Sequence, residues 1–316
     1  NYDFRNIHYE ITPEEKIKIF EETGDLDFSY EIPELASYSV NYYMHKDGIA
    51  AAFREIPSVI KTVEELGLPQ VVSKLADLPR GLVLVTGPTG SGKSTSLAAI
   101  IDEANRRRQD HIITIEDPIE FVHQSKGCLV NHREVGIHTR SFSAALRGAL
   151  REDPDIILVG EMRDLETISL AIEAANTGHL VFSTVHTTSA SSTVDRVIEV
   201  FPSHEQAQIR STLADSIRAI IAQTLFKRID IRGRIAAMEI LVATPAVRAL
   251  VRDAKSHQIP SAIQTGKRYG MQMLDDAIMD LLNRGKIDPD DAYAKAFEKA
   301  RFRPMLRKPP SDFTEA

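Results

Sequence analysis

One glycine-rich run in the first third of the sequence has the composition of a phosphate-binding loop. Residues 87–94 read Gly-Pro-Thr-Gly-Ser-Gly-Lys-Ser, which matches the pattern G-x-x-x-x-G-K-S/T in full. Lys93 would contact the β- and γ-phosphates of ATP, and the Ser94 hydroxyl would bind Mg²⁺. We therefore expect ATP and Mg²⁺ as cofactors. The predicted nucleotide-binding residues are Gly87, Pro88, Thr89, Gly90, Ser91, Gly92, Lys93, Ser94 and Thr95.

An acidic side chain follows the apolar run 156–159 after a single glycine. At the end of a strand beside the nucleotide, the Glu161 carboxylate could bind Mg²⁺, directly or through water, or orient the attacking water. Both tasks require the ionised form. The alternative is that Glu161 is only an acid at the start of a helix that begins near Met162. Together with the phosphate-binding loop, the pattern favours a catalytic glutamate.

Three further carboxylates follow the apolar run 112–115, at Glu116, Asp117 and Glu120. Acids that cluster at the end of a strand suit metal binding or the polarisation of water in the same cleft. Alternatively, Asp117 merely caps the turn before Pro118. Taken alone, this segment favours the turn.

Two histidines, His179 and His186, flank a fourth apolar run, 180–185. Side chains alternate along a strand, so histidines seven residues apart face opposite sides and cannot form a compact metal pair. One of them could sense the γ-phosphate through a hydrogen bond. The spacing alone favours structural roles for both.

The segment between the acidic cluster and the catalytic glutamate is rich in arginine. Arg147 and Arg151 would share a face if both lay on one helix. Ring-forming ATPases need an arginine that reaches a neighbour's phosphates, whereas the alternative is an exposed face that pairs with the acids at 152–153. The sequence leaves both interpretations open. The arginines concerned are Arg133, Arg140, Arg147 and Arg151.

The apolar runs indicate how these residues are positioned. Continuous apolar runs are typical of strands buried on both faces of a parallel sheet. Segments with helical periodicity, such as 165–175, separate the runs, and strands that alternate with helices predict an α/β fold. Beyond about residue 203 the pattern becomes mainly helical. The predicted strands are 82–86, 112–115, 156–159 and 180–185.

Short alternating segments at 26–30 and 38–44 predict a small sheet-containing domain before the phosphate-binding loop. The chain starts without Met, and we expect this domain to be truncated. We predict an N-terminal domain over 1–57, a linker over 58–68, an ATPase domain with a helical C-terminal part over 69–302, and a flexible tail over 303–316.

Composition and charge limit the class of protein. The 316 residues are 43% hydrophobic and 26% charged, which suffices for a globular core. A net charge of -7 provides no global basic field for nucleic acid, so we expect no such partner and disfavour a DNA motor. The single cysteine, Cys128, excludes an internal disulfide or a four-cysteine zinc module and fits a reducing compartment. No run approaches the roughly 20 apolar residues of a membrane span.

The order of these motifs resembles the secretion ATPase superfamily, which powers type II secretion, type IV pili and archaeal flagella. Within it the chain is most similar to the pilus retraction ATPases, through segments 79–86 and 151–157. Segment 246–253 is similar to their C-terminal motif Ala-Ile-Arg-Asn-Leu-Ile-Arg-Glu. The residues matching this retraction motif are Ala246, Val247, Arg248, Leu250, Val251 and Arg252.

The resemblance implies a PAS-like α+β N-terminal domain, a RecA-like P-loop domain and a homohexameric ring. It also implies Mg-ATP hydrolysis coupled to an inner-membrane platform protein, so that pilin is withdrawn for twitching motility. Such a motor is cytoplasmic, at the inner face of the inner membrane, and meets the membrane only through partners. By position, Glu161, Glu116 and His186 would be catalytic, with Asp117 and Glu120 in the acidic box and His179 in the histidine box.

One departure from the family concerns how a neighbouring subunit completes the site. The family usually has an Arg-Phe-Arg-like segment where this chain has Ser37, Tyr38 and Ser39. Arg54 is the candidate that replaces those arginines. Three other functions remain open: an accessory paralogue of the retraction motor, a regulator that binds nucleotide without hydrolysis, and, less favoured, a DNA translocase.

Overall fold

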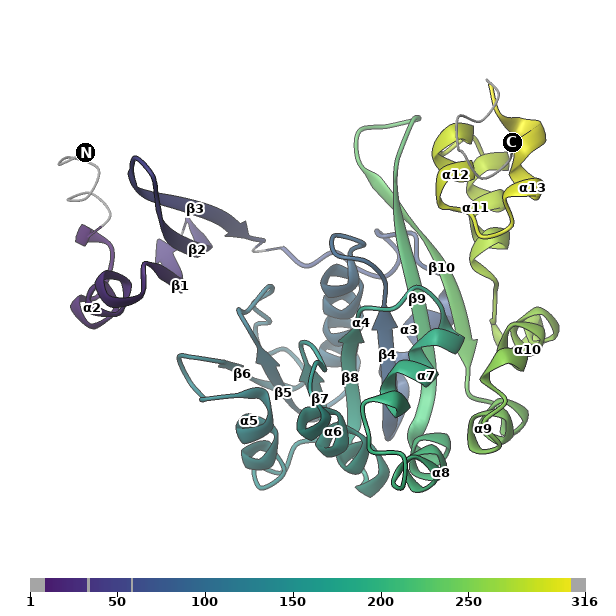
Figure 1. The fold of residues 1–316 in the computed structure, drawn as a ribbon, viewed down its shortest axis with the longest axis horizontal. Coiled ribbons are helices and arrows are strands. Elements are labelled where there is room, and N and C mark those ends of the chain that lie inside the picture. The colour runs from purple at the N-terminus through teal and green to yellow at the C-terminus, as the bar shows by residue number, and fades with distance from the viewer. Residues whose placement is uncertain (1–8, 33–34, 58, 308–316) are drawn as a thin grey trace.

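The computed structural model describes residues 9–32, 35–57 and 59–307. Within them, two sheets organise the chain (Figure 1). A three-stranded sheet has the order β1-β2-β3, and a seven-stranded sheet has the order β10-β9-β4-β8-β7-β5-β6. The predicted fold class, a small N-terminal sheet domain followed by a parallel-sheet α/β domain, is confirmed.

The small sheet is an antiparallel meander packed against one helix. Its core centres on Tyr42, whose ring meets Phe20 and Phe28 edge to face at centroid distances of 5.8 and 5.1 Å. The predicted strands at 26–30 and 38–44 are present. Strand β3 was not predicted, because its sequence, with three consecutive alanines, does not alternate between apolar and polar residues. The elements are α2 (Glu14–Thr23), β1 (Asp25–Ile32), β2 (Ala36–His45) and β3 (Gly48–Ile56).

The large sheet is parallel except for its last strand, β10, which pairs antiparallel with β9. Every residue of β4, β7 and β8 is buried, as their continuous apolar sequences predict. The strands are β4 (Gly81–Thr86), β5 (His111–Glu116), β6 (Leu129–Glu134), β7 (Ile156–Val159), β8 (Leu180–Val185), β9 (Ile217–Lys227) and β10 (Arg234–Val242).

Helices cover both faces of this sheet, and alternate residues of β4 point to each. Leu82 and Leu84 join the core beneath α5, α6, α7 and α8, while Val83 and Val85 join the core beneath α3 and α4. The helix predicted at 165–175 is α6. The bounds are α3 (Gln70–Lys74), α4 (Lys93–Arg107), α5 (Phe142–Ala149), α6 (Leu165–Thr177), α7 (Ala190–Glu199) and α8 (Gln206–Ser216).

The expectation of a mainly helical chain beyond residue 203 is wrong for 217–242, which form the long β9–β10 hairpin. Its first strand is rich in β-branched residues, and Gly233, with φ of 145°, lies in the turn, so strand signals were present in the sequence. Helices follow the hairpin: α9 (Pro245–Arg252), α10 (Ile259–Thr265), α11 (Leu274–Asn283), α12 (Pro289–Lys295) and α13 (Lys299–Phe302).

Short 3-10 helices occupy several of the connections. Of the tail predicted at 303–316, the first residues form η4, and 308–316 lie outside the described residues, as do 1–8, 33–34 and 58 of the predicted N-terminal domain and linker. Over the described ranges, the helices lack the combined length and apolar character that crossing a membrane requires. The 3-10 helices are η1 (Leu75–Asp77), η2 (Ser256–Gln258), η3 (Lys267–Tyr269) and η4 (Arg303–Met305).

The central strand β8 offers a test of the packing. Phe182 is fully buried there, so Phe182→Ala should lower the free energy of unfolding by roughly 3–5 kcal/mol through lost burial and the cavity left behind. Phe297, which is 54% exposed, is the matched control, and its alanine variant should stay within about 0.5 kcal/mol of wild type. Urea denaturation measures both. Equal effects of the two substitutions would contradict the packing described.

Candidate active site

The carboxyl ends of four neighbouring parallel strands, β4, β8, β7 and β5, meet at one edge of the large sheet. The loop 87–92 follows β4, and Glu116 ends β5. Glu161 and His186 follow β7 and β8 closely. Side chains from all four connections line a single cleft of about 730 Å³. The fold thus brings together the predicted motifs at the edge where open α/β sheets bind their ligands.

The phosphate-binding loop depends on glycine at two positions where the backbone has positive φ, Gly87 (145°) and Gly92 (87°). A Cβ on Gly87 would lie 2.4 Å from the carbonyl oxygen of Gln223, and one on Gly92 would lie 2.9 Å from its Nε2. Because β9 approaches the loop so closely, only glycine fits at either position.

Lys93 is the first residue of α4 and is 8% exposed. Its Nζ donates to the carbonyl oxygens of Gly87 at 2.9 Å and Pro88 at 3.2 Å. Burial lowers the pKa of the Lys93 ammonium below its ordinary value, and the carboxylates of Glu161 and Glu120 oppose that shift. A phosphate group beside this ammonium would supply the negative charge that burial makes favourable.

Glu161 lies between the imidazole of His186 and the guanidinium of Arg163. Its Oε1 is 2.9 Å from Nε2 of His186, and its Oε2 is 2.7 Å from Nη2 of Arg163. Burial by itself would raise the pKa of Glu161, but the hydrogen bond from Arg163 and the charges of His186, Arg163 and Lys93 outweigh burial. The pKa of this carboxyl therefore lies below its usual value, and Glu161 is ionised at neutral pH, as its predicted role requires.

Gly160 allows the ends of β5 and β7 to approach each other. A Cβ at this position would lie 3.3 Å from the carbonyl oxygen of Ile115 and 3.4 Å from Cα of Glu116. Contacts between 3.0 and 3.4 Å are tighter than most real Cβ contacts. Glycine before Glu161 therefore lets the ends of these two strands lie close together, and the carboxylates at 116 and 161 line the same cleft.

Glu116 is 7% exposed and accepts a hydrogen bond from the backbone N–H of Glu120 at 3.2 Å through Oε2. Its Oε1 is buried and makes no hydrogen bond within the described chain. Such an oxygen suits a hydrated hard cation, because Mg²⁺ prefers oxygen ligands and keeps waters and substrate phosphates in its shell. The described side chains form no cluster of three or more acidic, histidine or cysteine groups suited to hold a metal alone.

Two histidines in the acidic-box region were missed from the sequence. The rings of His123 and His132 stack with centroids 5.9 Å apart, and Nε2 of His132 lies 3.0 Å from the backbone nitrogen of His123. Burial, aided by the neighbouring His132, lowers the pKa of His123 to about 4. His123 is therefore neutral at pH 7 and lines the cleft without adding charge.

The sequence matches known proteins over most of its length. The profile of the family described as "Type II/IV secretion system protein" matches residues 61–286. The chain belongs to this secretion family. It is 57% identical to the type IV pilus retraction ATPase PilT of Pseudomonas aeruginosa, over 91% of the chain and 83% of that protein.

Two further relatives extend the comparison. A twitching motility protein of Neisseria gonorrhoeae is 54% identical, over 88% of the chain and 75% of that protein. A crystal structure of the pilus retraction motor PilT with bound ADP superimposes with a TM-score of 0.89 at 42% identity, and covers 95% of this chain and 85% of that one. The resemblance inferred from the motifs is confirmed at the level of the secretion family.

Only some of the histidines and arginines predicted as site residues line the cleft. His186 reaches the cleft, whereas His179 precedes β8 and its Nδ1 lies 3.0 Å from the carbonyl oxygen of Ala174. Arg54 on β3 lines the cleft. The arginines of 133–151 do not line it.

Two of the arginines of 133–151 form ion pairs with acidic side chains. Arg133 pairs with Glu152 at 3.0 Å, as the interpretation of an ion-paired face predicts, and Arg147 pairs with Glu166. Helix α5 ends at Ala149, so Arg147 and Arg151 do not share a helical face. Arg140 and Arg151 are exposed.

The segment predicted to match the retraction motif, 246–253, lies almost entirely in helix α9. Its buried side is Val247 and Val251, and Leu250 packs at the margin of the same core. On its other side, Nε of Arg248 donates to the carbonyl oxygen of Ala243 at 3.0 Å, and Arg252 pairs with Asp215 at 2.9 Å. The motif therefore has one apolar stripe and one side of arginines, away from the nucleotide cleft.

Gln223 of β9 is a further site residue that the sequence analysis missed. Its Nε2 donates to the carbonyl oxygen of Ser91 at 2.6 Å, and its Oε1 accepts from Oγ of Ser96 at 2.8 Å. The side chain is 3% exposed. It therefore links the phosphate-binding loop to the first turn of α4. No signal near residue 223 reveals this role, because the contact joins segments about 130 residues apart in sequence.

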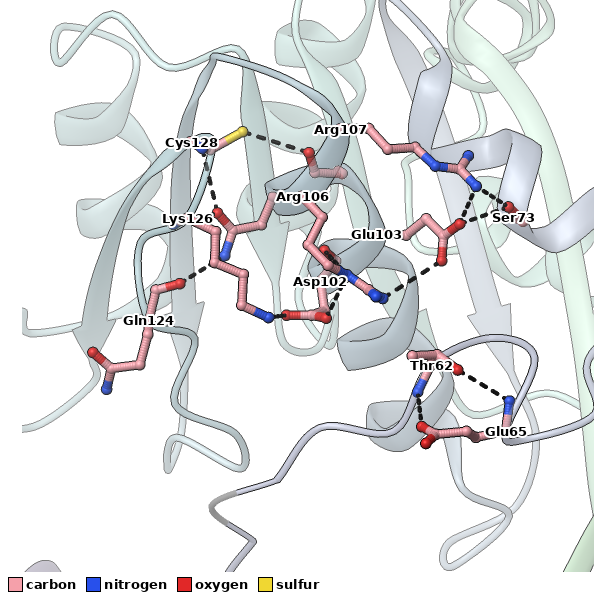
Figure 2. A network of polar contacts seen from close by, with 12 residues as sticks. Thr62, Glu65, Ser73, Asp102, Glu103, Arg106, Arg107, Gln124, Lys126 and Cys128 are labelled. Atoms are coloured by element: carbon pink, nitrogen blue, oxygen red, sulfur yellow. Dashed lines mark hydrogen bonds and ion pairs between the residues drawn. The ribbon is translucent and has the colours of Figure 1, made fainter. Parts of the chain in front are cut away.

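Two buried side chains of α4 anchor a polar network that holds the end of the loop after the acidic box (Figure 2). Asn105 of α4 is fully buried, donates through Nδ2 to the carbonyl oxygen of Gln124 at 2.7 Å and accepts from the N–H of Lys126 at 3.0 Å. Asp102, one turn earlier, receives Nζ of Lys126 at 2.5 Å and Nε of Arg106 at 3.0 Å. The helix that begins at Lys93 thus also holds the far end of the acidic-box loop.

Removing the Asn105 amide should destabilise this connection. Asn105→Ala leaves the Gln124 carbonyl and the Lys126 N–H without partners, each at a cost of roughly 1–3 kcal/mol. We expect a fall of about 2–4 kcal/mol in the free energy of unfolding, with faster amide hydrogen exchange over 120–128. Asn283→Ala, at an exposed helix end, is the control and should change neither measurement. Unaltered exchange in Asn105→Ala would mean that the loop is held by other contacts.

Proposed function

We propose that this chain is an Mg-ATP-hydrolysing motor that drives the retraction of type IV pili. The observation that carries the proposal is the ionised Glu161 carboxylate, held by His186 and Arg163 in the same cleft as the phosphate-binding Lys93. Similarity to PilT over most of the chain supports the same activity.

The residues of the cleft divide the chemistry among them. Lys93 exchanges its two loop carbonyls for β- and γ-phosphate oxygens, and the N–H groups at the start of α4 bind the same phosphates. The Ser94 hydroxyl, with Glu116 and Glu161 directly or through water, would hold Mg²⁺, which neutralises charge on the phosphates. Glu161 accepts a proton or a hydrogen bond from the attacking water, and His186 fixes the position of its carboxylate.

Arg54 supplies positive charge that the secretion family usually draws from two arginines of the N-terminal domain. In the register of β2 and β3, Arg54 stands directly opposite Ser39, one of the two serines that replace those arginines. A side chain opposite on the neighbouring strand shares its face of the sheet. Arg54 lines the cleft of its own chain, whereas the exposed Arg140 and Arg151 are the candidates to reach a neighbour.

We further propose that the motor is a homohexamer at the cytoplasmic face of the inner membrane, where it acts on the pilus platform protein. The arginines of α9 lie away from the nucleotide cleft and are suited to a partner, not to catalysis. A net charge of -7 supports partners other than nucleic acid.

Two substitutions separate binding from hydrolysis. Lys93→Ala should weaken nucleotide binding by about tenfold or more, because it removes a charge-assisted contact to the phosphates. Glu161→Ala should leave nucleotide affinity near wild type and lower kcat by about 10²–10⁴-fold, because it removes the group that acts on water. Fluorescent-nucleotide titration and steady-state ATPase assays measure the two effects. An ATPase rate unchanged by Glu161→Ala would overturn the enzymatic role and favour a regulator that binds nucleotide without hydrolysis.

The cellular role needs a separate experiment. Deleting the gene should abolish twitching motility and pilus withdrawal, and the wild-type gene, but not its Glu161→Ala form, should restore them. The wild-type complement controls for effects on neighbouring genes. Normal pilus withdrawal in the deletion strain would contradict a primary motor and favour an accessory paralogue.

A further inference from the structure

A second, smaller cavity adjoins the nucleotide cleft. It has a volume of about 150 Å³ and is open to solvent on one side. Glu161, Arg163 and His186 line both spaces, so these residues form their common wall. Arg196 and Val197 of α7 line only the smaller cavity. One water molecule needs roughly 10–15 Å³ of such space, so the cavity has room for a tetrahedral oxyanion together with hydrating waters.

The charges around this cavity favour an anion. Two guanidinium groups, Arg163 and Arg196, and the His186 imidazole face a single carboxylate, Glu161. Each oxygen of that carboxylate already has a nitrogen partner, one from Arg163 and one from His186. Arg196, by contrast, makes no ion pair or hydrogen bond to any part of the chain that the structure describes. One wall of the cavity is therefore an exposed guanidinium that no described carboxylate pairs with.

The remaining walls are apolar, with Ile168, Val185, Val197 and Val200 beside the charged groups. Both guanidinium groups are accessible to an anion from solvent, because Arg196 is exposed and the side chain of Arg163 is 74% exposed. Guanidinium groups offer paired N–H donors that match the oxygen spacing of phosphate.

We propose that the smaller cavity binds orthophosphate, with Arg196 as the ligand that belongs to this cavity alone. The inference rests on the proposed function, because hydrolysis joins water to the γ-phosphorus, breaks its bond to ADP and yields orthophosphate beside Glu161. Arg163 and His186 line both cavities, so they can contact the phosphate on either side of the common wall. The smaller cavity is then a binding site that orthophosphate occupies as it leaves the nucleotide cleft.

The test measures binding of orthophosphate itself, by broadening of its ³¹P NMR signal in titrations with the purified full chain. Lys93→Ala removes the ammonium of the main phosphate site and should leave binding in the smaller cavity. Adding Arg196→Gln to that variant should weaken the remaining binding by about tenfold, the effect of losing one charge-assisted contact. Arg196→Lys should recover part of the affinity.

Arg232→Gln is the matched control, since it removes the same charge from an exposed position outside both cavities. It should leave phosphate binding unchanged in the Lys93→Ala background. Loss of all binding in Lys93→Ala alone, or equal binding with and without Arg196→Gln, would overturn the proposal. An ATPase assay of the wild-type chain separates the two proposals. Arg196-dependent phosphate binding without ATP hydrolysis would support the phosphate cavity and contradict the motor. ATP hydrolysis without Arg196-dependent phosphate binding would support the motor and contradict the phosphate cavity.

Discussion

The balance of charge between buried Lys93 and Glu161 is the constraint on which the site depends. A desolvated ammonium and a half-buried carboxylate are each unfavourable alone, and the fold offsets both by putting them in one cleft with His186 and Arg163. The parallel sheet makes this possible because the ends of β4 and β7 lie at the same edge. Gly87 and Gly92 then allow β9 to approach the phosphate-binding loop, and Gly160 allows the ends of β5 and β7 to approach each other.

Local patterns in the sequence were sufficient for the framework of the site. The phosphate-binding loop, the four apolar strands and the glutamate after Gly160 each carry their signal within a few residues, and all meet at one edge of the sheet. Helix α6 and the first strands of the small sheet were found for the same reason.

The parts that were missed depend on contacts between distant segments. Gln223 acquires its role only when β9 reaches the phosphate-binding loop, about 130 residues earlier in the sequence. The pair at 123 and 132 lies close in sequence, but its rings stack only because the chain after β5 folds back against β6. The β9–β10 hairpin was taken for helix because its apolar run, like any short one, does not distinguish a buried strand from a buried helix. The ion pairs of Arg133 and Arg147 could not be predicted from sequence alone, because an arginine that pairs with an acid and one that reaches a neighbour's phosphates have the same local sequence signal.

Strand β9 contacts both the phosphate-binding loop and the C-terminal helices. Gln223 contacts Ser91, and three residues further along the same strand Phe226 is buried among Leu274 and Ile278 of α11. Over 223–226 the strand pairs with β10, whereas β4 pairs with its earlier part, up to Ala222. One short segment of a single strand, 223–226, therefore holds both the phosphate-binding loop and the core of the C-terminal helices, so neither contact can shift without the other.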